Sequence, residues 1–143
     1  MINPQDYLDN HHTLLLVKPD VIERSLENDV IHFISQFGFK IIALRRQTLS
    51  RDHTSKLYAH LWDHPCYPEL LAFMENEVLV TIWHHQDDAI AQMMKITGVT
   101  DSQLAEVGTV RNIWGTNQQR NAVDRSDSLE SFKHELEIFK HAF

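Results

Sequence analysis

Residues 13–20 read TLLLVKPD, an apolar run that stops at a lysine, a proline and an aspartate. A run of this length that ends at a proline is typical of a buried β-strand, because proline cannot continue the hydrogen-bond ladder. The other elements are assigned outward from this strand. The polar residues 1–12 form a lead before it, and we expect one domain over 13–143, since 143 residues suffice for one hydrophobic core.

The rest of the chain alternates between apolar residues at helical spacing and short β-rich runs. The helical pattern predicts helices over 27–37, 51–61 and 87–97, a short helix after Pro65, and a last helix opened by a capping box of Asp127 and Glu130. The β-rich runs predict strands over 40–44, 78–83 and 121–123. Residues 99–119 are mostly polar and are expected to form a long irregular loop, a place where function often lies.

The predicted order is therefore strand, helix, strand, two helices, strand, helix, loop, strand and helix. Without the inserted helical hairpin this order is βαββαβ, which predicts an α+β ferredoxin-like sandwich with an antiparallel four-stranded sheet and helices on one face. Because this fold supports many functions, the function must be argued from particular side chains.

Composition and charge exclude several classes of protein. The net charge of −7 argues against a nucleic-acid-binding protein, which needs a basic face. No apolar run is long enough to span a membrane, and residues 1–12 lack the apolar centre of a signal peptide, so we expect a cytoplasmic protein. The single Cys66 cannot form an internal disulfide and is expected to be a half-buried small side chain. His60 and His64, like the pair at 84–85, are expected to be surface histidines, because no metal-ligand motif completes a set.

Five short motifs follow one another along the chain: KPD at 18–20, a tyrosine at 58, GVTD at 98–101, GTVR at 108–111 and RNAVDRSDS at 120–128. In this order and at these separations the chain resembles the nucleoside diphosphate kinases, without a gap from about Thr13 to Phe139. The resemblance implies a ping-pong reaction, in which a histidine takes the γ-phosphoryl group of a nucleoside triphosphate and passes it to a diphosphate. It also implies Mg²⁺ bound with the nucleotide, and a homo-oligomer in which dimers build a tetramer or hexamer.

The resemblance assigns the phosphates and the sugar of the nucleotide to five residues. Lys18 would neutralise the γ-phosphoryl oxygens, and Tyr58 would orient the reacting centre through its hydroxyl. Thr100 and Arg111 would hold the β-phosphate region, and Asn121 would bond a sugar hydroxyl.

Five further residues are expected to have supporting roles. The resemblance implies that Leu70 helps to clamp the base, and that Ser126 and Glu135 orient whatever occupies the nucleophile position. Asp20 and Asp127 are expected to be structural, the first by tying a loop and the second by capping the last helix.

Four positions depart from the family's pattern. Asp124 stands where the family has its histidine nucleophile, Arg125 where a small residue follows it, Met94 where an arginine contacts phosphate, and Cys66 where an aromatic ring stacks on the base. A carboxylate is shorter than an imidazole, and its charge about 4 Å from a phosphate charge costs roughly 4 kcal/mol at an effective dielectric of about 20. Arg125 can supply a compensating cation. The three companion departures favour natural divergence over one engineered substitution at position 124.

Three functions are therefore open from the sequence. The first is a nucleotide-binding family member in which phosphohistidine transfer is lost or severely impaired. The second is a working phosphotransferase or triphosphate hydrolase, in which Asp124 forms an aspartyl phosphate or activates water. The third is a non-catalytic oligomeric interaction module that binds no nucleotide.

Overall fold

A four-stranded sheet forms the centre of the molecule. The computed structural model describes residues 1–143, and its strands lie in the order β2-β3-β1-β4 with every neighbouring pair antiparallel. The strands are β1 (His12–Val17), β2 (Lys40–Thr48), β3 (Glu77–His84) and β4 (Val123–Arg125). This order confirms the ferredoxin-like arrangement predicted from the sequence.

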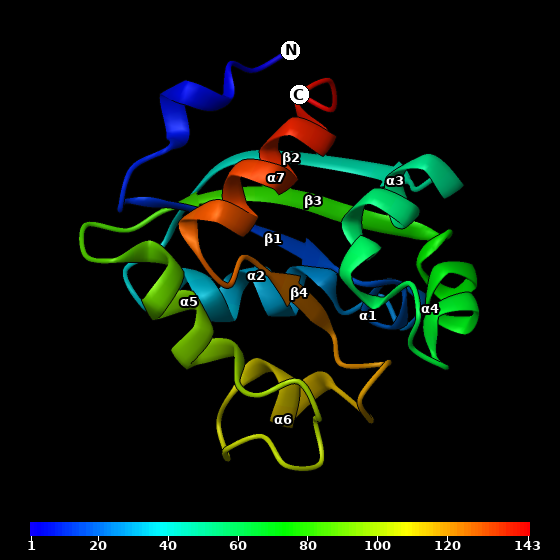
Figure 1. Cartoon of the computed structure of the whole chain (residues 1–143). Helices are drawn as coiled ribbons and strands as arrows, with labels where there is room; N and C mark the ends of the chain where they lie inside the picture. Colours follow the sequence, from blue (N-terminus) through cyan, green and yellow to red (C-terminus); the bar gives the residue numbers. More distant parts are fainter.

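Seven α-helices connect and cover the strands (Figure 1). They are α1 (Pro19–Glu23), α2 (Glu27–Ser35), α3 (Arg51–Leu57), α4 (Tyr67–Met74), α5 (Ala89–Thr97), α6 (Val110–Trp114) and α7 (Leu129–Phe139). Two 3₁₀ turns add to them, Pro4–Tyr7 before β1 and Ala59–Leu61 between α3 and α4. The helical hairpin predicted between the second and third strands is thus formed by α3, the second 3₁₀ turn and α4.

Helices cover both faces of the sheet, and the expectation of helices on one face is wrong. Leu14 and Leu16 of β1 belong to a buried core that includes residues of α4 and α7. Leu15 and Val17 point to the opposite face and belong to a second core with residues of α2 and α5. Both faces of β1 carry apolar side chains, so each needs its own covering layer (Figure 1).

The last strand lies two residues later than predicted. Its ladder with β1 pairs Val17 with Val123, Leu16 with Asp124 and Leu15 with Arg125. The reason is the backbone of Ala122, which has a φ of 73° and therefore cannot be part of an extended strand. Asp124 consequently lies in the middle of β4.

Two short helices were not predicted. Helix α1 begins at Pro19, directly after β1, and α6 interrupts the stretch 99–119 that was expected to be an irregular loop. Each helix has five residues, which is too short to show an apolar period in the sequence. Only the cap of α6 marks it locally, because the Thr109 side chain accepts a hydrogen bond from the backbone N–H of Asn112.

The cap of α7 also differs from the prediction. Ser128, immediately before the helix, forms a reciprocal capping box with Ser131, in the place that was assigned to Asp127 and Glu130. The Asp127 carboxylate instead accepts a hydrogen bond of 2.6 Å from Arg125. Asp127 is one position too early to cap the helix, which leaves its side chain free for this pair.

The two ends of the chain lie at the same side of the molecule (Figure 1). The backbone N–H of Ile2 donates a hydrogen bond of 3.0 Å to the carbonyl oxygen of Lys140, just after α7.

None of the helices combines the length and the apolar character that crossing a membrane would take.

Candidate functional site

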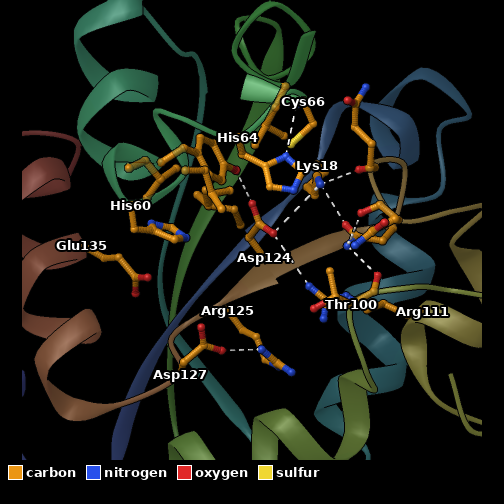
Figure 2. A pocket seen from close by; sticks show the side chains of 18 of the residues that line it. Lys18, His60, His64, Cys66, Thr100, Arg111, Asp124, Arg125, Asp127 and Glu135 are labelled. Carbon is orange, nitrogen blue, oxygen red and sulfur yellow. Dashed lines mark hydrogen bonds and ion pairs between the residues drawn. The ribbon is translucent and has the colours of Figure 1, made fainter. Parts of the chain in front are cut away.

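A cavity of about 410 Å³ opens between β1 and β4, the α3–α4 hairpin and the segment that contains α6. Its volume lies within the range of roughly 300–1,000 Å³ that is usual for small-molecule sites. Figure 2 shows the cavity with Asp124 near its centre and the side chains of the hairpin on one side. Most of the predicted site residues line it: Lys18, Tyr58, Leu70, Thr100, Arg111, Asn121, Asp124 and Glu135.

The backbone before β4 determines where Asp124 points. Ala122 adopts a left-handed conformation, and its N–H donates a hydrogen bond of 3.0 Å to the buried carboxylate of Asp20. Its carbonyl oxygen accepts a hydrogen bond of 2.9 Å from the N–H of Lys18. Because Asp124 pairs with Leu16, its side chain faces the hairpin and α7. Asp20 therefore has the predicted structural role, because it holds the backbone of Ala122 in place. It lies in α1 and not in a loop.

One hydroxyl donor and two cations surround the carboxylate of Asp124. The hydroxyl of Tyr58 donates a short hydrogen bond to Oδ2, while Oδ1 lies 4.0 Å from Nζ of Lys18 and 3.7 Å from Nη2 of Arg111. Burial raises the pKa of Asp124, but Lys18, the Tyr58 hydroxyl and the two nearby arginines outweigh it, so this pKa lies below its usual value. Asp124 is therefore a carboxylate at neutral pH, with cations on one oxygen and a hydroxyl on the other.

Tyr58 is held in its neutral form. Burial, followed by the charge of Asp124, raises the pKa of the phenol well above its usual value. The hydroxyl therefore keeps its proton and remains a hydrogen-bond donor to the carboxylate.

Lys18 is fixed before any ligand binds. Its Nζ donates hydrogen bonds of 2.6 Å to the carbonyl oxygen of Gln119 and 2.8 Å to Oδ1 of Asn121, and the side chain is only 2% exposed. Burial lowers the pKa of Lys18, and the nearby Asp124 and Asp20 partly offset this shift. The ammonium group is thus a positioned charge, held by the segment that leads into β4.

Asn121 connects Lys18 to the long segment 99–119. Its amide nitrogen donates to the carbonyl oxygens of Thr100, at 2.9 Å, and Gln118, at 3.1 Å. Both ends of this amide are therefore engaged in holding the site together. The sugar contact implied by the resemblance stays a prediction, because a ligand would have to share or replace these bonds.

Arg111 comes from α6, the helix that was missed. Its guanidinium donates hydrogen bonds of 3.1 Å to the carbonyl oxygen of Gly98 and 2.8 Å to that of Val123. Its Nε is buried without a hydrogen-bond partner. Burial lowers the pKa of Arg111, and the charge of Asp124 opposes this shift. One buried donor of this residue is therefore unpaired in the structure.

Arg125 points away from Asp124, because neighbouring residues of a strand face opposite sides of the sheet. Its guanidinium donates to the hydroxyl of Thr97, at 2.8 Å, and to the carbonyl oxygen of Gly98, at 3.2 Å. The third contact is the ion pair with Asp127 seen in Figure 2. Arg125 lines the cavity, but its charge is already paired with Asp127. Arg125 was expected to compensate the charge of Asp124, and in the structure this role is weak.

Glu135 also lines the cavity and, unlike Asp124 and Asp127, has no cation beside it. It projects from α7 and accepts a hydrogen bond from Ser126, which is itself fully buried. Burial is the main cause that raises the pKa of Glu135 to about 8. Glu135 is therefore mostly protonated at neutral pH, in contrast to Asp124.

The hairpin supplies the remaining wall. Leu57, His60, Leu61, His64 and Cys66 line the cavity from this side. Nδ1 of His64 accepts a hydrogen bond of 3.2 Å from the N–H of Cys66, so a neutral ring carries its proton on Nε2. His60 and His64 are exposed, as predicted, and both line the cavity. The prediction of a surface position is wrong for His85, which is buried with its Nε2 2.9 Å from the carbonyl oxygen of Phe37.

Met94 is the one departing position that lies outside the cavity. It is 37% exposed on α5, and the residues that line the cavity do not include it. Ser126 also does not line the cavity and reaches it only through Glu135.

The comparisons with known proteins agree with this geometry. Residues 11–142 match the family model described as nucleoside diphosphate kinase. The nucleoside diphosphate kinase of Persephonella marina is 39% identical over 127 residues, which cover 89% of this chain and 91% of that protein. Nucleoside diphosphate kinase 1 of Protochlamydia amoebophila is 35% identical over 130 residues, which cover 91% of this chain and 92% of that protein.

Solved structures are similar over the same extent. The nucleoside diphosphate kinase of Aquifex aeolicus has a TM-score of 0.83 at 30% identity and covers 90% of this chain and 94% of that one. The enzyme of Encephalitozoon cuniculi has a TM-score of 0.85 at 28% identity and covers 90% of this chain and 88% of that one.

Proposed function

The chain belongs to the nucleoside diphosphate kinase family, and from that premise we propose that it binds nucleoside di- and triphosphates with Mg²⁺ while its phosphohistidine transfer is lost or severely impaired. The observation that carries the proposal is the identity of residue 124. The group at the centre of the cavity is a carboxylate, surrounded by two cations and a phenol. We propose that this is the position of the family's nucleophile.

The surroundings of Asp124 make it a weak nucleophile. A carboxylate with a lowered pKa is a weaker base than imidazole, and one of its oxygens already accepts a hydrogen bond from the Tyr58 hydroxyl. The other oxygen lies between Lys18 and Arg111, so attack on phosphorus would require it to leave both cations. The negative charge also opposes the approach of a phosphate.

The same side chains support nucleotide binding. Lys18 and Arg111 are buried, positioned cations that suit phosphate oxygens, and Arg111 retains an unpartnered N–H. Thr100 adds a hydroxyl at the mouth of the cavity, and Leu70 adds an apolar surface suited to a base. We propose that Asn121 orients Lys18 as well as the sugar.

The cavity offers no free carboxylate to Mg²⁺, so it fits only an ion that the nucleotide phosphates themselves would hold. Mg²⁺ commonly binds substrate phosphates, waters and only one or two carboxylates. The acids that line the cavity are engaged otherwise, since Asp124 faces cations, Asp127 pairs with Arg125 and Glu135 is protonated. When bound, Mg²⁺ supplies neutralisation of the phosphate charges, and this chain's part is to hold the nucleotide through Lys18 and Arg111.

We also propose that the chain forms a homo-oligomer in which dimers build a tetramer or hexamer. Strand β2 is an edge of the sheet, and its Ile42 and Leu44 are 44% and 48% exposed. An exposed apolar edge strand is a surface on which a second chain can pair. Sedimentation equilibrium of the whole chain tests this assembly, and a monomer at all concentrations would contradict it.

The function is tested by phosphoryl transfer from ATP to GDP with Mg²⁺, measured for the native chain and for Asp124→His. We expect no GTP from the native chain above the level of Lys18→Ala, and GTP formation once the histidine is present. Transfer by the native chain would contradict the proposal and favour a carboxylate nucleophile. Failure of both proteins to bind any nucleotide at millimolar concentration would instead favour an interaction module.

A further inference from the structure

The Asp124 carboxylate occupies an anion-binding position that is already complete. Its Oδ2 accepts a hydrogen bond from Tyr58, and its Oδ1 lies 4.0 Å from Nζ of Lys18 and 3.7 Å from Nη2 of Arg111. These three side chains come from the end of β1, the hairpin and α6, and all three meet at Asp124. Figure 2 shows Lys18 and Arg111 beside this carboxylate. A cluster of two cations and a hydroxyl is also what a terminal phosphoryl group needs.

From this coincidence we propose that Asp124 is a built-in substitute for a terminal phosphoryl group, so that the chain binds nucleoside diphosphates in preference to triphosphates. The inference rests on the proposed nucleotide binding and adds a selectivity to the same site. In this proposal Asp124 determines specificity, because its carboxylate lies where the terminal phosphoryl group of a triphosphate would bind.

The donors that remain fit a shorter phosphate chain. Arg111 has an Nε without a hydrogen-bond partner, and Thr100 and His64 line the same cavity. Arg125, the next cation along the chain, is bound to Thr97, Gly98 and Asp127. The cavity therefore offers no free buried arginine or lysine to a third phosphate, while Lys18 and Arg111 are shared with Asp124.

Charge repulsion acts in the same direction. A γ-phosphoryl group that approached Lys18 would also approach the carboxylate, and like charges at close range repel strongly in a partly buried site. The carboxylate stays charged at neutral pH because the surrounding cations and the Tyr58 hydroxyl lower its pKa. A diphosphate ends before this position and keeps the benefit of the cations.

The test is calorimetric titration of the whole chain with ADP and with ATP, each in excess Mg²⁺ at pH 7.5. We expect the native chain to bind ADP at least about tenfold more tightly than ATP, which corresponds to about 1.4 kcal/mol. In Asp124→Asn, which keeps an acceptor for Tyr58 but removes the charge, ATP should gain more affinity than ADP, and the preference should fall to about threefold or less. Asp124→Ala serves as a second uncharged variant.

Asp52→Asn is the matched control, because it removes the same charge from an exposed residue of α3 that pairs only with Lys56. It should keep the native preference for ADP. Equal or tighter binding of ATP by the native chain overturns the inference, and so does an unchanged ratio in folded uncharged variants. If neither nucleotide binds the native chain, the proposed function itself fails, which is a different result from binding without selectivity.

Discussion

Asp124 and Glu135, two of the three carboxyl groups that line the cavity, have opposite electrostatic environments. Asp124, on β4, faces Lys18 and Arg111, and its pKa lies below the usual value. Glu135, on α7, is half-buried beside the hydroxyl of Ser126 without a cation, and desolvation raises its pKa to about 8. At neutral pH one group is therefore charged and the other mostly neutral.

The difference shows that the residue type does not determine the charge in this cavity. Nearby cations stabilise the charged form of a carboxyl group, whereas burial without them stabilises the neutral form. A phosphate entering the cavity would meet repulsion from Asp124 and little repulsion from Glu135. The predictions below change one side of this comparison at a time.

The largest effect on stability is expected when Lys18, one of the two cations beside Asp124, is replaced. Lys18→Met keeps the length of the side chain but leaves Asp124 with one cation less and removes two hydrogen bonds to the segment before β4. Breaking a buried ion pair costs about 3–5 kcal/mol, and we expect about 3 kcal/mol here because Asp124 is 27% exposed. Urea unfolding of the native chain and the variant measures the loss.

The double variant Lys18→Met with Asp124→Asn isolates the pair itself. Removing the carboxylate should cost less in the Lys18→Met background than in the native chain, with a coupling of at least about 1 kcal/mol. Additive losses would mean that Lys18 contributes only through Gln119 and Asn121.

A smaller effect on stability is expected when the neutral carboxyl group is replaced, in Glu135→Gln. The carboxyl group ionises near its usual pKa in the unfolded chain and only near 8 in the folded one. The folded state therefore binds more protons between these values, and the native chain loses stability as the pH rises toward 8. Glutamine does not ionise. The free energy of unfolding of Glu135→Gln, relative to that of the native chain, should therefore grow with pH, by at least about 1 kcal/mol at pH 8.5.

Thermal unfolding from pH 5 to 8.5 checks this pH dependence. Glu137→Gln is the control on the same helix, since Glu137 is exposed and pairs with Lys140. Parallel pH profiles for native and Glu135→Gln would contradict the assignment of a neutral Glu135.

The smallest effect is expected at Arg125, which lies next to Asp124 in the sequence but on the other face of β4. Arg125→Ala should change the affinity for ADP with Mg²⁺ by less than about threefold, because its charge is already paired with Asp127. Arg111→Ala, measured alongside by calorimetry, should weaken binding by at least about tenfold, since charge-assisted bonds to phosphate are strong. A tenfold loss at Arg125 would show that it holds phosphate.

The sequence was sufficient for the sheet and most of the cavity. The apolar patterns gave the order of strands and helices along the chain, and that order indicated the ferredoxin-like sheet. The resemblance carried by the ordered motifs placed Lys18, Tyr58, Arg111 and Asp124 in one site, and all four line the cavity. Helices α1 and α6 were missed because five residues carry no readable period. The second covered face of the sheet was missed because a count of elements does not say on which side a helix packs.

The details of charge in the site could not be predicted from the sequence. Arg125 was expected to compensate Asp124, but the alternation of β4 turns it toward Thr97. The opposite protonation of Asp124 and Glu135 depends on distances between residues that are far apart in the chain. No local pattern encodes those distances.

The most direct measurement uses ATP that carries a radioactive γ-phosphoryl group. Native chain and Asp124→His are mixed with it and Mg²⁺, denatured within seconds, and the label that stays on the protein is counted before and after acid treatment. We predict no label on the native chain, and an acid-labile label on Asp124→His, as expected for phosphohistidine. Label on the native chain that is lost in Asp124→Asn would contradict the central claim, because Asp124 would then be a nucleophile and not a fixed anion.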